Sequence, residues 1–380
     1  MTRARDVSRL ITTPPNIYAT DSESSAGFLS LSSASSIYQG APFRNLIING
    51  AMQVAQRSTS VASITADTYA TTDRWRLLPS TQGTWTMSQE NDAPTGSGFR
   101  KSTKVLCTTA DASPAAGDYV RLDQRIEGQN LQHLKKGTAS AQQLTLSFWV
   151  KSNVTGTYIA RFYENDNNRN ISKSYTINSS ATWEYKTITF PADTTGPLDN
   201  DNEASLILIF MLGAGTDSTS GTLATTWQSY TAANAAVGQV NLASAISNYW
   251  QITGVQLEVG DTATPFEFKP FAQDLVECQR YYHKSTGVQY MGFGSGPGES
   301  GGWSNISVFL PATMRTFPTV SQSNLSSFNG SGSNSVTGIR SASMSVSGGT
   351  IQFFHAATNG QSIIIYSNAT TSYVDFSAEL

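Results

Sequence analysis

The chain has 380 residues, with 24 lysines and arginines against 27 aspartates and glutamates, and a formal net charge of -3. A general nucleic-acid binder carries a basic excess, so this balance argues against that class. Hydrophobic residues make up 39% of the chain, too many for a disordered protein. Charged residues make up only 13%, and the many Gly, Ser, Thr and Asn residues are typical of β-strands joined by turns.

Residues 1–43 form a first segment that cannot build a core of its own, because it is polar and broken by prolines such as Pro42. Its charged start lacks an apolar stretch, so we expect no secretory signal. We interpret it either as a terminal tail or as an anchor that orders on a partner. The candidate anchor residues are Arg3, Arg5, Leu10 and Ile11.

Residues 44–270 are predicted to form one large β-sandwich of the jelly-roll type, because short strand-like segments alternate with turns. Asn-rich and Asp-rich clusters mark several of the turns. Gly254 predicts a β-bulge in the last strand. The expected strands are residues 143–151, 157–163, 183–190, 204–212 and 250–259.

Residues 271–285 are predicted to form a short linker helix that follows Pro270. An apolar stripe runs along it at helical spacing. The helix then either caps the neighbouring sandwich or forms a seam between subunits. The residues of the stripe are Phe271, Leu275, Cys278 and Tyr282.

Residues 286–380 are predicted to form a smaller C-terminal β-sandwich with strand-like segments at 306–311, 350–354, 362–366 and 373–380. The glycine-rich stretch 292–302 is expected to be a loop or hinge. The chain as a whole is therefore predicted to be all-β. It has an N-terminal segment, a large sandwich, one linker helix and a second sandwich. No run of about 18 apolar residues occurs, so no membrane insertion is expected.

Several short strings, taken in order, resemble a known family. Residues 45–57 followed by 72–75 resemble the opening of the β-domain in many bacteriophage tail-fibre and other virion structural proteins. Residues 125–128, 146–152 and 253–260 resemble later parts of that domain, and 278–285 and 310–320 resemble the C-terminal module that commonly follows. The resemblance implies a phage virion appendage, commonly a homotrimer. It also implies a jelly-roll domain like those of carbohydrate-binding modules, but it supplies no binding residues.

From this resemblance we expect a non-catalytic virion protein, made in the host cytoplasm and tail-fibre-like. It would bind other virion proteins through its N-terminus and a host surface glycan through its β-domains. One alternative is a purely structural component, such as a head or neck decoration or a fibre mount, without receptor binding. A less favoured one is a polysaccharide depolymerase, which needs two carboxylates roughly 5–10 Å apart. Its acidic candidates are Asp123, Glu127, Glu258 and Glu267.

Aromatic residues are the candidates for glycan contact, because flat rings stack on the apolar faces of sugars. Trp149 alternates away from the apolar face formed by Leu144, Leu146, Phe148 and Val150, so it points away from that face. For each aromatic residue the alternative is a core or subunit-interface position. The candidates are Trp149, Trp183, Trp227 and Tyr230, with Trp85 considered beside them.

No cofactor is expected. The turns at 164–168 and 199–203 are rich in the oxygen ligands that calcium prefers. Neither matches the spacing of an EF-hand loop. A solvated turn is the favoured interpretation of both, and a structural calcium ion is the alternative.

Overall fold

The computed structural model describes residues 43–356 and 360–380. The expected anchor residues Arg3, Arg5, Leu10 and Ile11 lie outside them. Residues 45–380 form one compact unit, separate from residues 1–44. Its regular secondary structure is almost entirely β-strand, which confirms the predicted fold class. No helix in the described ranges is long and apolar enough to cross a bilayer.

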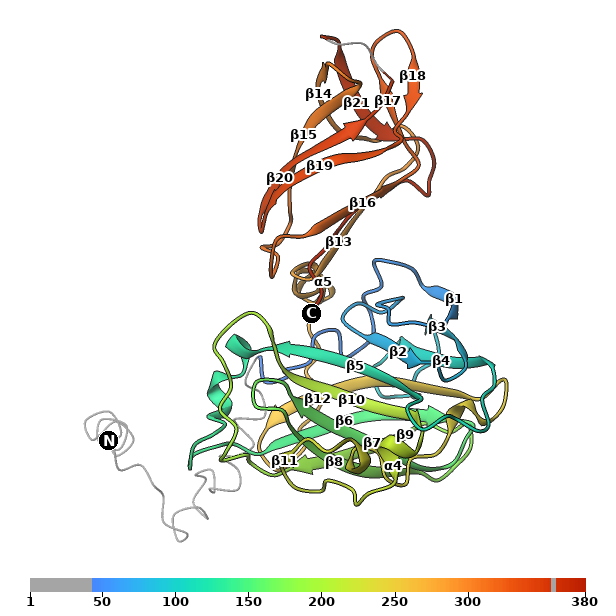
Figure 1. Cartoon of the computed structure of the whole chain (residues 1–380), viewed down its shortest axis with the longest axis vertical. Helices are drawn as coiled ribbons and strands as arrows, with labels where there is room; N and C mark the ends of the chain where they lie inside the picture. The colour runs from blue at the N-terminus through green and yellow to red at the C-terminus, as the bar shows by residue number, and fades with distance from the viewer. Residues whose placement is uncertain (1–42, 357–359) are drawn as a thin grey trace, which may run out of the picture. The chain divides into compact units, whose positions relative to one another are not determined.

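Two six-stranded antiparallel sheets form the large sandwich (Figure 1). Sheet A has the order β1 (Ser60–Ile64), β3 (Thr84–Glu90), β4 (Ser102–Thr109), β12 (Tyr249–Val259), β6 (Leu144–Ser152) and β9 (Glu184–Phe190). Sheet B has the order β11 (Gln228–Ser229), β8 (Arg169–Ile177), β7 (Gly156–Glu164), β10 (Ala204–Ala214), β5 (Tyr119–Glu127) and β2 (Arg76–Ser80).

Side-chain alternation divides each strand between the core and an outer face. Leu146, Phe148 and Val150 of β6 are fully buried in the main core, whereas Trp149 between them is half-buried on the outer face. In β10, Phe210 belongs to that core, but Ile207, Ile209 and Met211 form a separate apolar cluster on the outer face of sheet B. Alternate side chains along each strand therefore enter the core, and the residues between them lie on the outer face of the sheet.

The predicted bulge at Gly254 is confirmed. Its φ is 62°, and the pairing of β12 with β6 shifts register between Thr253 and Gln256. A Cβ at this position would lie 2.5 Å from the ring of Phe99. Glycine is therefore required here both for its backbone conformation and for the close approach of an aromatic side chain.

The predicted linker helix is shorter than expected. Helix α5 spans Phe271–Gln279, and the next element is strand β13 (Tyr282–Thr286). The prediction of helix up to residue 285 was therefore wrong, because the backbone of β13 pairs along its whole length with β22 (Tyr373–Ser377). The predicted stripe is also not uniformly buried, since Phe271 is 54% exposed whereas Cys278 is 0% exposed. Within residues 43–356 and 360–380, the helical elements other than α5 are short: α4 (Thr216–Thr219) and the 3-10 turns Gly128–Asn130, Gln132–Leu134, Ala232–Asn234 and Leu242–Ser244.

The C-terminal strands form a three-stranded and a seven-stranded sheet around a second core. The first has the order β13, β22 and β16 (Thr319–Ser323). The second has the order β18 (Ser333–Ser335), β17 (Leu325–Phe328), β21 (Ser362–Ser367), β14 (Gly292–Glu299), β15 (Trp303–Phe309), β20 (Gly348–Phe354) and β19 (Gly338–Ser345).

The glycine-rich stretch 292–302 is thus largely strand β14 and not the expected loop. A Cβ at Gly296 would lie 2.1 Å from the carbonyl oxygen of Asn305, and one at Gly294 would lie 2.3 Å from the side chain of Ile306. The glycines therefore allow β14 to lie against the neighbouring strand β15.

A buried polar network, here called the junction cluster, connects β5 and the segment before β2 with the residues after α5 and the end of the chain. The Arg74 side chain is 1% exposed; it donates to the Glu379 carboxylate and, at 2.7 Å, to the carbonyl oxygen of Arg125. Arg57 lies 3.1 Å from the same carboxylate. The guanidinium of Arg74 also lies 3.4 Å from the centre of the Tyr281 ring.

Glu127 is the second carboxylate of this cluster. It is 0% exposed and accepts two hydrogen bonds from the Arg280 guanidinium, at 2.8 and 2.7 Å. The Tyr281 hydroxyl donates to it as well. Burial alone would raise the pKa of Glu127, but the donors from Arg280 and Tyr281 hold that pKa below its ordinary value. The junction cluster is therefore Arg57, Arg74, Glu127, Arg280, Tyr281 and Glu379.

Replacing Glu379 by Gln removes the charge that Arg74 needs. A buried charge left without its partner costs about 3–5 kcal/mol, so we expect the free energy of unfolding to fall by that amount. Urea denaturation measures it. The matched control is Glu203→Gln, because Glu203 is 68% exposed in its ion pair with Arg315. That change should cost about 0–1 kcal/mol. Equal losses in both variants would contradict a structural role for the buried pair.

Because Asp73 is buried, at 1% exposed, we expect the free energy of unfolding to depend on pH. Burial is the largest influence and raises the pKa of Asp73 to about 6, although Gln56 and Arg57 oppose it. The unfolded side chain has a pKa near 3.9. This contribution to stability is therefore present below about pH 4 and lost as the pH rises through about 6.

Between pH 4 and pH 7, the wild type should therefore lose about 2–3 kcal/mol of unfolding free energy relative to Asp73→Asn, which cannot titrate. Urea denaturation of both proteins at both pH values gives this difference directly. A difference that does not change with pH would contradict the raised pKa.

Candidate functional site

The aromatic residues predicted from the sequence fall into two groups on opposite sheets. Trp149 lies in β6 and Trp183 directly precedes β9, so both belong to sheet A. Trp227 and Tyr230 flank β11 at the edge of sheet B. Trp85 lies in β3 and is 0% exposed in the main core, where no ligand reaches it.

The strand register gathers aromatic side chains on the outer face of sheet A. Trp149 is paired with Tyr185 of β9, and their ring centroids are 5.3 Å apart. Trp183 lies two residues before Tyr185 and so faces the same side. Tyr249 of β12 faces this side too, with the ammonium of Lys104 4.7 Å from its ring centre. These residues, Trp149, Trp183, Tyr185 and Tyr249, are called the aromatic face.

Asp92 is the polar centre of the aromatic face. Its carboxylate accepts hydrogen bonds from Lys151, from the indole nitrogen of Trp183 at 3.2 Å and from the side-chain amide of Gln251 at 3.3 Å. Burial alone would raise the pKa of Asp92, but these donors hold it below its ordinary value. The side chain is 48% exposed. An ionised carboxylate with acceptor capacity open to solvent therefore lies beside the rings.

This arrangement suits a sugar better than an apolar ligand. Half-exposed rings provide platforms for the C–H faces of a pyranose. The carboxylate of Asp92, which Lys151 and Gln251 hold in place, provides an acceptor for hydroxyl groups within the same patch. Tyr185 is 46% exposed, so its ring is available to a ligand without any movement of the chain.

Trp227 and Tyr230 have structural surroundings instead. The Trp227 indole donates to the carbonyl oxygen of Pro191 at 2.8 Å, and its ring packs against the main core with the ammonium of Lys136 3.8 Å away. The Tyr230 ring lies 5.4 Å from that of Tyr163 on the outer face of sheet B. The structure therefore does not bring these two residues together with Trp149 and Trp183.

Sequence reasoning missed most of the polar partners on the aromatic face. Tyr185 had a readable signal, since it follows Trp183 by two positions in a predicted strand. Asp92 had none, because it lies 59 positions from Lys151 and 159 from Gln251. Only the order of strands in sheet A brings these side chains together.

The two acidic turns lie next to each other. The carboxylate of Asp166 accepts a hydrogen bond from the backbone of Asp199 at 2.9 Å, and Asp201 accepts one from the backbone of Glu203 at 2.9 Å. Across residues 43–356 and 360–380, no three His, Cys, Asp or Glu side chains gather as metal ligands.

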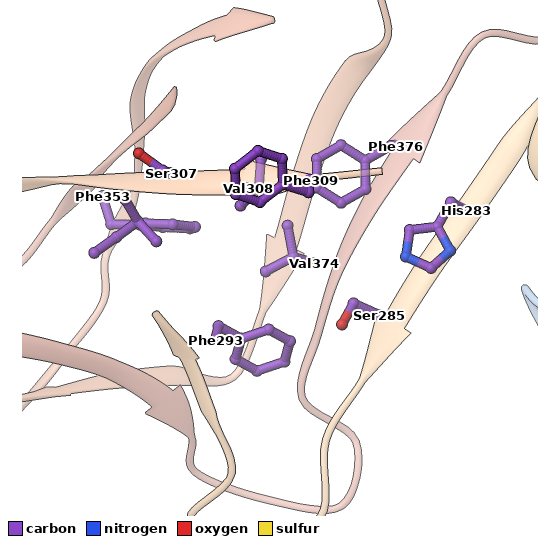
Figure 2. Close-up of a pocket in the computed structure, with 10 residues that line it drawn as sticks. His283, Ser285, Phe293, Ser307, Val308, Phe309, Phe353, Val374 and Phe376 are labelled. Carbon is purple, nitrogen blue, oxygen red and sulfur yellow. The ribbon is translucent and has the colours of Figure 1, made fainter. Parts of the chain in front are cut away.

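An apolar pocket of about 310 Å³ lies between the C-terminal sheets (Figure 2). His283 and Ser285 of β13 line one side. The ring of Phe376 from β22 stacks on the His283 ring, with 5.9 Å between the ring centroids. Phe293, Ile306 and Phe353 supply much of the apolar wall. Phe309 also borders the pocket and is 91% exposed. It therefore leaves a large apolar surface in water.

No protein-family model matches the sequence, and no curated protein matches it. Solved structures give weak similarities. The enzymatically active domain of tailspike protein 4 of bacteriophage CBA120 has 16% identity and a TM-score of 0.31. The similarity covers 58% of this chain and 22% of that one, so this chain spans about a fifth of the tailspike.

Two carbohydrate-binding modules are similarly distant. The family 11 module of a cellulosomal cellulase from Clostridium thermocellum has 13% identity and a TM-score of 0.29, covering 54% of this chain and 99% of the module. A xylan-binding domain of Paenibacillus barcinonensis Xyn10C has 10% identity and a TM-score of 0.25. The similarity covers 54% of this chain and 94% of that domain. At these scores the similarities carry no argument about what this chain binds.

Proposed function

We propose that this chain is a non-catalytic, tail-fibre-like protein of a bacteriophage virion that binds a host surface glycan through the aromatic face. The observation that carries the proposal is the cluster of half-exposed rings at Trp149, Trp183 and Tyr185 beside the ionised carboxylate of Asp92. The virion part of the proposal rests on the strings at 45–57, 72–75 and 278–285. We also propose that the chain is located in the virion and binds other virion proteins. This proposal includes no nucleic-acid partner and no membrane insertion.

The surroundings of the acidic residues favour binding over catalysis. Asp123 is held by two hydrogen bonds from Arg76, and Glu127 by Arg280 and Tyr281. Both lie in β5 of sheet B, away from the aromatic face. Glu258 accepts hydrogen bonds from Gln256 and Thr264, and Glu267 accepts one from the backbone of Asn45. All four acids are engaged in hydrogen bonds within the fold, which supports a non-catalytic role.

A homotrimer is part of the proposal. Phe309, Phe317, Tyr290 and Val288 are 91%, 70%, 72% and 71% exposed, and all lie in the C-terminal β region. Contact between copies would cover such surface. A single sugar site usually binds weakly. Three linked glycan sites would raise the apparent affinity, because binding at one site increases the effective concentration of glycan at the others.

Variants of the aromatic face test the glycan proposal. The purified full-length chain is applied to an array of bacterial surface glycans, and the best binder is then titrated by calorimetry. Trp149→Ala and Tyr185→Ala should each weaken binding about tenfold or more, because each removes a stacking platform. The control Trp227→Phe keeps an aromatic ring at the edge of sheet B and should bind as the wild type does.

Three results would overturn this proposal. The first is that the folded, oligomeric wild type retains no glycan at micromolar concentration. The second is that Trp227→Phe loses as much affinity as Trp149→Ala. The third is that reducing ends accumulate from the bound polysaccharide and that Asp123→Asn or Glu127→Gln stops their release, which would make the chain a hydrolase.

The proposed anchor has its own test. A chain lacking residues 1–43 should keep the oligomer mass of the full chain in light scattering, because the exposed apolar side chains of the C-terminal region remain. It should not be incorporated when it replaces the full chain during phage assembly. Incorporation equal to that of the full chain would show that the virion contact lies elsewhere.

A further inference from the structure

The outer face of sheet B carries an unusual concentration of arginine. Arg161 of β7 and Asp123 of β5 both lie opposite Ile209 of β10, so they share one row across the sheet. Arg125 shares the next row with Tyr163, since both lie opposite Ile207. Arg121 lies two positions from Asp123 on the same side. We call Arg121, Arg125, Arg161, Tyr163, Asn170 and Tyr230 the arginine face.

The charges on this face do not balance. Asp123 accepts two hydrogen bonds from Arg76, at 2.9 and 2.8 Å, and lies 3.2 Å from Arg121. Arg125 and Arg161 form no ion pair with any described residue. Arg161 is only 4% exposed, and its guanidinium lies 5.3 Å from the ring centre of Tyr230. Arg161 is favoured by a side-chain hydrogen bond with Tyr230 and by the charge of Asp123, but a buried cation that forms no ion pair is still costly.

Unsatisfied polar atoms are concentrated at the same place. Of the 12 buried side-chain nitrogen and oxygen atoms that lack a hydrogen bond in the described ranges, five belong to the arginine face. They are Nε of Arg121, Arg125 and Arg161 and both amide atoms of Asn170, although Nε of Arg121 lies 3.2 Å from the Asp123 carboxylate. Asn170 is 0% exposed, although it occupies a strand position opposite Tyr163. A ligand that accepts from the arginines and both donates to and accepts from an amide would satisfy them.

The loop at 215–240 bounds the face on one side. It is held over β7 and β8 by hydrogen bonds from Ser172 to the carbonyl oxygen of Ala224, at 2.7 Å, and from the backbone of Ile159 to Gln239, at 2.8 Å. Tyr230 comes from this loop. On the opposite side Arg121, Arg125 and Tyr163 are only half-buried. A ligand that approaches over β5 therefore meets Arg121, Arg125 and Tyr163 directly, and it meets Arg161 only at the 4% of that side chain that is exposed.

We propose that the arginine face binds a carboxylate-bearing sugar unit, so that acidic glycans are the ligand class of this second site. The inference deepens the proposed glycan function and rests on it. A guanidinium matches a carboxylate with two parallel hydrogen bonds, and the half-buried Tyr163 and Tyr230 rings offer a surface for the sugar ring. Because the chain has a net charge of -3, general attraction to polyanions does not explain such binding.

The experiment is calorimetric titration of the full-length chain with trigalacturonic acid, 3′-sialyllactose and glucuronic acid. The trigalacturonic acid trimer with its carboxyls reduced to alcohols is the neutral probe. Wild type should bind at least one acid, and binding should weaken with added salt. Arg125→Gln and Arg161→Gln should each weaken it about tenfold or more, as expected for loss of a charge-assisted hydrogen bond. Arg340→Gln, an exposed arginine of β19, removes the same charge elsewhere and should have no effect.

Arg125 is only half-buried, so replacing it disturbs the fold less than replacing Arg161. Arg125→Gln therefore still tests the proposal if Arg161→Gln fails to fold. The inference is overturned if no acid binds below about 10 mM, which corresponds to a negligible affinity. It is also overturned if the neutral trimer binds equally, if Arg340→Gln loses as much as Arg125→Gln, or if poly-glutamate binds and no sugar does. Glycan binding that depends on Trp149 but not on Arg125 would leave the aromatic face intact and reject only this second site.

Discussion

A guanidinium that water cannot reach determines how residues 45–380 hold together. Arg74 is 1% exposed, and an unpartnered charge at such a position would cost several kcal/mol. Its partners come from distant parts of the chain: Glu379 from the C-terminus, the carbonyl oxygen of Arg125 from β5, and the Tyr281 ring from the residues after α5. The large sandwich, the helix and the last residues must therefore all be in place before this charge is satisfied.

Strand β5 links this junction to the outer face of sheet B. Its backbone at Arg125 and its side chain at Glu127 serve the junction cluster, while Arg121 and Arg125 extend from its outer side. Sheet A presents aromatic rings around a carboxylate, and sheet B presents arginines beside tyrosines. One sandwich thus offers two outer faces of different chemistry, and both follow from the period of two along strands whose other side forms the core.

Sequence periodicity predicted the fold class, five strands of the sandwich, the bulge at Gly254 and the outward direction of Trp149. It failed where long-range pairing decides the outcome. The helical spacing from Phe271 to Tyr282 was overridden by the pairing of β13 with β22, and β14 was hidden because its glycines are needed for close packing against β15. Asp92 and its donors could not be grouped in advance, because strand order is a property of the assembled sheet.

Competition for phage adsorption measures glycan recognition by this chain directly. Host cells are preincubated with the purified full-length chain, and the fraction of phage that attaches is then counted. If the aromatic face binds the host glycan, the wild-type chain reduces adsorption in a saturable manner, Trp149→Ala at the same concentration does so much less, and Trp227→Phe acts like the wild type. Adsorption unchanged by a folded wild-type chain, or reduced equally by all three proteins, would contradict glycan recognition through the aromatic face.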